Sequence, residues 1–169
     1  MQQDFANELE RTFTGESYAA APSHILEGID EALAHRVFPH APRTIYSELW
    51  HMAFWQKLSL DWVRGIPTPN PAKAADGFPT QVDVVHESWN ELRGRFARTC
   101  AEAAAIARDP SSYETVVRCP SPPGYPERTM TVREQLENLT AHNAYHLGRI
   151  VLMRQLASSW PPPSGGFTW

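Results

Sequence analysis

The chain has 169 residues and carries 15 lysines and arginines against 19 aspartates and glutamates, which gives a formal net charge of −4. This acidic balance, without a basic stripe, excludes a protein whose main partner is nucleic acid. No stretch approaches about 18 uncharged apolar residues, so we expect no membrane span and no membrane partner. The length suits one domain over residues 1–169 that folds without a disulfide framework or a structural metal.

Fifteen prolines divide the chain into five proline-free segments, and proline disrupts helix interiors. The first two, near residues 2–14 and 23–37, repeat apolar residues one helical turn apart and predict helices of moderate length. The third, near 43–64, carries an apolar stripe made of Ile45, Leu49, Met52, Trp55 and Leu58. The fourth, near 80–108, carries one made of Val82, Val85, Trp89, Leu92, Phe96 and Ala103.

The fifth segment, near 131–158, opens with TVRE, in which Thr131 and Glu134 can form a capping box. Its stripe passes through Val132, Leu139, His142, His146, Ile150 and Met153. We therefore predict an all-α, up-down-up-down four-helix bundle with an additional short helix.

Three connections complete the expected fold. Residues 65–79 read as a proline-rich crossover, and residues 110–130 predict a small β-hairpin between the last two long helices. The tail, 158–169, reads as an extended proline-rich strap with Phe167 and Trp169 as aromatic anchors.

Three histidines are the main functional signal. His142 and His146 stand four residues apart, which places both imidazoles on one helix face. They replace hydrophobic residues at two core-facing turns, and His51 repeats the anomaly on the third segment. Burying imidazoles costs a few kcal/mol unless each finds a partner, and one shared metal ion would satisfy all three. The spacing alone is weak, because ordinary helix histidines, one exposed and one hydrogen-bonded, would give the same pattern.

Three protein ligands with one open position are typical of a catalytic metal rather than a structural one. Neutral imidazoles suit Zn, Ni, Fe(II) and Mn to differing degrees, so the ligands do not select one divalent ion.

Helical spacing also suggests residues beside the ligands. Glu48 precedes His51 by three residues and could orient an imidazole or act as a base, or could be a solvated glutamate. Asn138 precedes His142 by four and could bind a ligand or the substrate, or simply line the pocket. Arg149 could engage a substrate carboxylate, although a surface arginine is commoner.

Aromatic residues and thiols offer weaker signals. Trp55 and Tyr145 could form walls of a substrate pocket or pack in the core. Cys100 and Cys119 are too few for a disulfide framework and lack C-x-x-C spacing. Cys119 could approach the site as a thiol, but no neighbour would lower its pKa. Because the N-terminal residues also lack a signal-peptide pattern, we expect a reduced, cytoplasmic protein.

The chain resembles the DinB/YfiT-like metalloenzyme family. The resemblance rests on RTIYSELWHMAFWQKLSLDWVRG, on MTVREQLENLTAHNAYHLGRIVLMRQL and on the closing WPPPSGGFTW. It implies a four-helix bundle in which His51, His142 and His146 bind one divalent metal ion. Characterised relatives include transferases that join low-molecular-weight thiols such as bacillithiol to electrophiles, and a mycothiol-dependent isomerase.

The resemblance implies a metal-dependent enzyme with a small-molecule substrate, either a thiol-dependent S-transferase or a hydrolase. A low-molecular-weight thiol would then be a possible co-substrate. The alternative is a non-catalytic metal-binding or small-molecule-binding protein that uses the same bundle site. The hydrophobic helix faces also permit a homodimer, which we expect.

Overall fold

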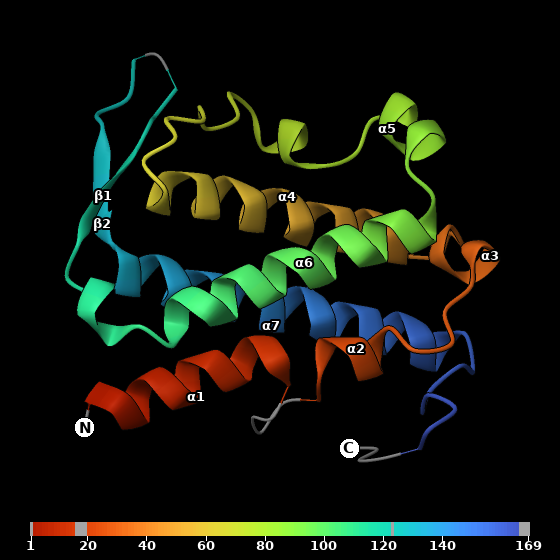
Figure 1. The fold of residues 1–169 in the computed structure, drawn as a ribbon. Helices are drawn as coiled ribbons and strands as arrows, with labels where there is room; N and C mark the ends of the chain where they lie inside the picture. The colour runs from red at the N-terminus through yellow and green to blue at the C-terminus, as the bar shows by residue number, and fades with distance from the viewer. Residues whose placement is uncertain (1, 16–19, 123, 166–169) are drawn as a thin grey trace.

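The computed structural model describes residues 2–15, 20–122 and 124–165, and four long helices dominate this part of the chain (Figure 1). They are α1 (Gln2–Thr14), α4 (Ile45–Val63), α6 (Trp89–Ala107) and α7 (Val132–Leu156). The shorter elements are α2 (Pro22–Ile25), α3 (Glu31–Ala34), α5 (Gln81–His86) and the 3₁₀ turns η1 (Ala74–Gly77) and η2 (Pro110–Ser112). The predicted helical bundle is confirmed.

Side-chain caps determine where three of the long helices begin. Thr44 caps α4 by accepting a hydrogen bond from the amide of Ser47. The predicted capping box of Thr131 and Glu134 is confirmed at the start of α7, and Ser88 and Glu91 form another at the start of α6. Each such cap stabilises its helix by about 1 kcal/mol.

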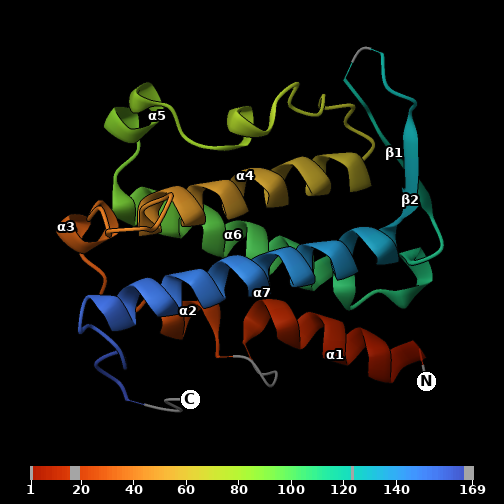
Figure 2. The same cartoon turned by 180° about the vertical axis from the view of Figure 1, so that it is seen from behind.

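The helices do not alternate strictly in direction. The Tyr46 hydroxyl at the start of α4 donates to the Glu87 carbonyl just before α6, at 2.8 Å. Near the other ends of these helices, Arg64 pairs with Glu102, also at 2.8 Å. α4 and α6 are therefore parallel, and the up-down-up-down prediction is wrong at this step. The cause is the proline-rich segment after α4, which returns along the length of the bundle before α6 begins (Figures 1 and 2).

The single helix expected near 23–37 is also wrong, because α2 and α3 divide this segment. Gly28 has a φ of +72°, a conformation that stops a helix and favours glycine. Asp30 then starts α3 by accepting a hydrogen bond from the amide of Leu33 at 2.8 Å. α3 is the additional short helix of the prediction.

The segment near 80–108 divides in the same way, at Ser88, into α5 and α6. Val82 and Val85, which the predicted stripe assigned to the core, are 63% and 79% exposed. The core stripe of this segment begins only at Trp89, whose indole is buried and donates to the Ile29 carbonyl.

The predicted hairpin is confirmed as β1 (Val116–Cys119) and β2 (Arg128–Thr131), which pair antiparallel with Val116 opposite Thr131. In the tail, the buried Arg154 donates to the Ser159 carbonyl and so fixes the start of the expected strap. The two predicted aromatic anchors, Phe167 and Trp169, lie outside the described residues.

The hydrophobic core consists of two clusters with a polar layer between them. One cluster lies toward α2 and α3 and includes Tyr46, Leu49, Trp89, Phe96 and Ile150. The other lies toward the hairpin and includes Leu58, Trp62, Tyr113, Leu136 and Leu139. Buried polar side chains occupy the middle of the bundle, namely Glu48, His51, Gln56, Thr99, Asn143 and His146. Among the described helices, none is both long and apolar enough to cross a membrane.

Candidate metal centre

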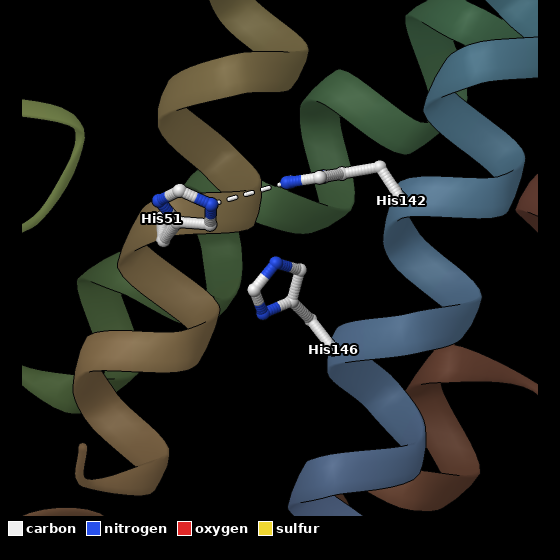
Figure 3. A group of neighbouring side chains, drawn as sticks. All are labelled: His51, His142 and His146. Atoms are coloured by element: carbon white, nitrogen blue, oxygen red, sulfur yellow. Dashed lines mark hydrogen bonds between the residues drawn. The ribbon is translucent and has the colours of Figure 1, made fainter. Parts of the chain in front are cut away.

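His51 of α4 and the pair His142 and His146 of α7 point toward one another in the middle of the bundle (Figure 3). One ring nitrogen from each histidine lies within 4.8 Å of the other two. α4 and α7 are antiparallel, so the midpoint of one helix faces the midpoint of the other. The predicted convergence of the three histidines is confirmed.

The Nε2 atoms face the shared centre, because the Nδ1 atoms of two rings are engaged elsewhere. Nδ1 of His51 donates to the Gly77 carbonyl at 2.7 Å, and Nδ1 of His146 lies 2.5 Å from a carboxylate oxygen of Glu48. Nε2 of His142 lies 3.1 Å from Nε2 of His51 (Figure 3). Each ring can therefore direct one nitrogen lone pair to the same point.

These distances fit a metal site. Two nitrogens bound to one zinc ion at about 2.0–2.1 Å in a tetrahedral site stand about 3.3 Å apart. The observed 3.1 Å between His51 and His142 is close to that value, and the 4.8 Å limit leaves only a small adjustment for His146. Nδ1 of His142 is buried without a hydrogen-bond partner among the described residues.

Burial also favours the neutral form of two of these histidines, His142 and His51. It is the main cause that lowers the pKa of His142 to about 4, and the nearby His146 and His51 lower it further. Burial likewise lowers the pKa of His51, against the hydrogen bond to Gly77, which raises it. These two imidazoles are therefore unprotonated near neutral pH and can donate lone pairs to a cation.

Glu48 lies behind His146, on the side away from the shared centre. Its carboxylate is fully buried, with one oxygen at Nδ1 of His146 and the other 2.8 Å from the Arg149 guanidinium. A carboxylate on the outer nitrogen of a metal ligand fixes the tautomer and orientation of the ring. Arg149 compensates the buried negative charge. The geometry thus favours the orienting alternative for Glu48 over the solvated one.

Aromatic side chains surround the histidines. The Phe78 ring stacks on His51 with 4.1 Å between ring centroids, and Trp55 meets the same imidazole edge-on at 6.1 Å. Tyr145 meets His146 edge-on at 4.9 Å while remaining 62% exposed. Trp55 and Tyr145 thus each contact one of the three histidines. Sequence reasoning missed Phe78 and Gly77, because nothing in their local pattern shows that the crossover folds back onto His51.

A buried polar network next to the histidines was also missed. The Gln56 side chain donates to the Thr99 hydroxyl at 3.2 Å and accepts from the Asn143 amide at 2.8 Å. Gln56 interrupts an apolar stripe just as His51 does, so this polar residue at a core position was a readable signal. The network connects α4, α6 and α7 beneath the metal centre.

Two candidate residues lie apart from the histidines. The exposed Asn138 has its side-chain amide 3.8 Å from the Met130 sulfur. Cys119, the last residue of β1, is buried and accepts a hydrogen bond from Gln135 at 2.9 Å. Burial raises the pKa of its thiol. Within the described residues no hydrogen bond joins Asn138 or Cys119 to the three histidines.

A surface groove with a volume of about 660 Å³ lies elsewhere, between α1, α2 and α6. Its walls include Phe13, Leu26, Phe96 and Cys100, and no histidine contributes to it. The three histidines instead lie beneath the crossover, where Gly77 and Phe78 contact His51, so the candidate site was identified from side-chain chemistry rather than from surface shape.

Comparison with known families gives one match. A family model described as the DinB superfamily matches residues 18–150, a range that contains all three histidines. No curated protein and no solved structure matches the chain.

Proposed function

Because this chain belongs to the DinB superfamily, we propose that it is a metal-dependent enzyme acting on a small molecule at a three-histidine centre. The observation that carries the proposal is the convergence of three ring nitrogens within 4.8 Å in an otherwise hydrophobic bundle. Three protein ligands leave one position free on a tetrahedral ion, as in catalytic sites.

His51, His142 and His146 are the proposed ligands of one divalent ion, which can be Zn, Ni, Fe or Mn. When bound, such an ion supplies a Lewis acid that stabilises negative charge on a substrate atom. Glu48 orients His146 through Nδ1, and the Arg149 guanidinium lies 2.8 Å from the other Glu48 carboxylate oxygen. The fully buried Glu48 thus supports the ligand geometry rather than touching the substrate.

Trp55 and Tyr145 are the proposed substrate contacts, because each meets a ligand imidazole edge-on and Tyr145 is also exposed. Arg149 has its guanidinium near Tyr145 as well, with 5.7 Å to the ring centroid. It can therefore meet an anionic substrate group on its exposed side. Asn138, one turn before His142 on α7, keeps a proposed role as a hydrogen-bond donor to the substrate.

The proposed reaction is transfer of a low-molecular-weight thiol to an electrophile, or hydrolysis of a small substrate. In the transfer, the thiol sulfur forms a bond to an electrophilic carbon. The leaving group departs with its electron pair, and the thiol proton passes to solvent. In the hydrolysis, the water oxygen forms the new bond to the electrophilic atom, the leaving group departs with its electron pair, and a water proton passes to solvent. The superfamily membership supports this class of chemistry, and the polar site within an apolar core is compatible with either reaction.

Activity assays separate the enzyme from the non-catalytic binder. Zinc-loaded protein is incubated with bacillithiol, mycothiol, glutathione or coenzyme A and a panel of electrophiles, and with hydrolysable esters. Turnover that disappears in His146→Ala supports the enzyme. Stoichiometric binding of a thiol or ester without turnover supports the binder instead.

Metal analysis tests the step on which both depend. Wild-type protein is expected to retain one zinc, nickel, iron or manganese ion per chain, and His51→Ala to retain far less. Equal metal content in the two proteins would exclude the proposed centre.

We further propose a homodimer in the cytoplasm. Figure 2 shows α7 across the front of the bundle with no other element over its outer face. Three exposed residues of α7, namely Tyr145, Leu152 and Leu156, are spaced seven and four residues apart and so share one side of the helix; the last two are 55% and 60% exposed. An exposed apolar row on one helix is suited to self-association. The two cysteines, both buried as free thiols, suit a reducing compartment.

A further inference from the structure

The crossover between α4 and α5 runs along the outer side of α4 and places η1 above the middle of that helix (Figures 1 and 2). Two hydrogen bonds attach its first part to the rest of the protein. The Thr68 carbonyl accepts one from the Trp62 indole at 2.7 Å, and the backbone amide of Asn70 donates the other. Its far end is fixed where Thr80 and Asp83 cap α5. Residues 71–79, between these two attachments, are named the crossover wall below.

The crossover wall touches the bundle at the proposed metal ligand. The Gly77 carbonyl accepts the hydrogen bond from Nδ1 of His51 at 2.7 Å. The next residue, Phe78, stacks on the same imidazole at 4.1 Å with an angle of 12° between the rings. On its other face, the Phe78 ring carries the Arg43 guanidinium, 4.2 Å from the centroid. The His51 ring is thus held at its outer nitrogen and across one face.

We propose that the crossover wall is a working part of the metal centre: Gly77 and Phe78 position His51, and bound metal in turn holds the wall against α4. This inference rests on the proposed metal binding. It assigns a positioning role to two residues outside the bundle that contribute no ligand atom.

The coupling follows from the chemistry of imidazole. A carbonyl oxygen only accepts hydrogen bonds, so the contact with Gly77 requires the hydrogen of neutral His51 to be on Nδ1. The lone pair is then on Nε2, which faces the shared centre. Binding a cation through Nε2 therefore selects the same tautomer that anchors Gly77. By linkage, whatever favours metal binding favours the docked wall, and the reverse holds equally.

The close approach of the backbone at Gly77 supports this positioning role. A Cβ atom at this residue would lie 3.2 Å from the Trp55 indole nitrogen and 3.5 Å from Nδ1 of His51. A side chain there would crowd the Trp55 indole, whereas its Cβ would be in ordinary van der Waals contact with His51. Glycine thus allows the carbonyl to reach the imidazole at hydrogen-bonding distance.

Limited proteolysis with trypsin measures how firmly the crossover wall is docked. Trypsin cleaves after lysine and arginine, and Lys73 is the only such residue between Arg64 and the end of α5. The full-length protein is treated with trypsin in excess zinc or in EDTA, and cleavage after Lys73 is followed by mass spectrometry. Zinc is expected to slow this cleavage about tenfold by suppressing local opening. Cleavage after Arg36, in the exposed loop that follows α3, is the internal control and should not change.

Variants test the named residues. In Phe78→Ala, zinc should bind about tenfold more weakly, and saturating zinc should protect Lys73 much less than in wild type. Gly77→Ala should act in the same direction. The matched control is Val82→Ala on α5, where the side chain is 63% exposed and both readouts should remain as in wild type. Circular dichroism verifies folding, and the wild-type comparison of zinc with EDTA decides the inference even if a variant misfolds.

A zinc titration by calorimetry separates the two proposals. If wild type binds zinc and Lys73 cleavage is equally fast with and without it, the coupling is refuted while the metal centre stands. If wild type binds none of zinc, nickel, iron(II) and manganese in the same titration, the proposed function fails and the coupling fails with it. Equal zinc affinity and equal protection in Phe78→Ala and wild type would refute the positioning role.

Discussion

Replacing Glu48 by glutamine tests whether the buried carboxylate orients the proposed ligand. Glutamine keeps the shape and can still accept a hydrogen bond from Nδ1 of His146, but it lacks the negative charge. In the wild type this charge serves two contacts, at 2.5 Å to His146 and 2.8 Å to Arg149. The substitution therefore changes electrostatics around the site while the packing of α4 stays the same.

The expected loss is in metal affinity more than in folding stability. Removing a partner of a ligating histidine typically weakens metal binding by about 10- to 100-fold, which corresponds to about 1.4–2.8 kcal/mol. Leaving one charge of a fully buried pair without its partner costs about 3–5 kcal/mol. Arg149 is 29% exposed and can turn its guanidinium toward water, so the loss of stability should be well below that range.

The assay is a zinc titration in competition with a chromophoric chelator, combined with urea unfolding of the metal-free protein. The matched control is Glu137→Gln on α7, which removes an exposed pair with Arg133 of that helix. It should alter neither the zinc affinity nor the free energy of unfolding. Zinc affinity within twofold of wild type in Glu48→Gln would refute the orienting role.

Three further predictions follow from burial and exposure. Because burial lowers the pKa of His142 to about 4, the unfolded state binds this proton more readily. The free energy of unfolding of the metal-free protein, measured with urea, should therefore be independent of His142 above pH 6.5 and fall by up to about 3 kcal/mol between pH 6.5 and 4. A flat profile over this range contradicts the prediction. Glutamate at both Leu152 and Leu156 should convert the proposed dimer to monomer in light scattering, and an unchanged dimer mass would exclude α7 as the interface. Gln56→Leu should cost about 1–3 kcal/mol of unfolding free energy by leaving the Asn143 amide unpaired, and no loss would show that the network is not stabilising.

The histidine cluster could be predicted because each member breaks a strong local rule. A polar residue on an apolar helix stripe needs a partner wherever it is buried, and the i, i+4 pair already shares one face. Gln56 breaks the same rule and could have been identified in the same way.

The break before α6 was also readable. Ser88 and Glu91 have the S-x-x-E spacing of a capping box, and this local signal should have outweighed the apparent continuity of the apolar stripe. The split at Gly28 is a similar case, because glycine followed by Asp30 is a stop and a start in close succession.

The parallel arrangement of α4 and α6, and the contact of Phe78 with His51, could not be predicted in this way. Both depend on the path of the chain through space. A connection rich in proline can either turn sharply or run the length of a helix, and local propensity does not distinguish these outcomes. The sequence therefore indicates that His51 is a buried polar residue, but it does not indicate which residues hold the His51 ring in place.

The crossover has a consequence for how the protein can change over evolution. Residues 72–76 are exposed, so substitutions and insertions there should leave the bundle intact, whereas the next two residues touch His51. New substrates could thus be accommodated by exchanging a short surface segment, while the helices that supply the histidines remain the same. In protein engineering, this connection is the place where loop libraries would vary selectivity separately from folding.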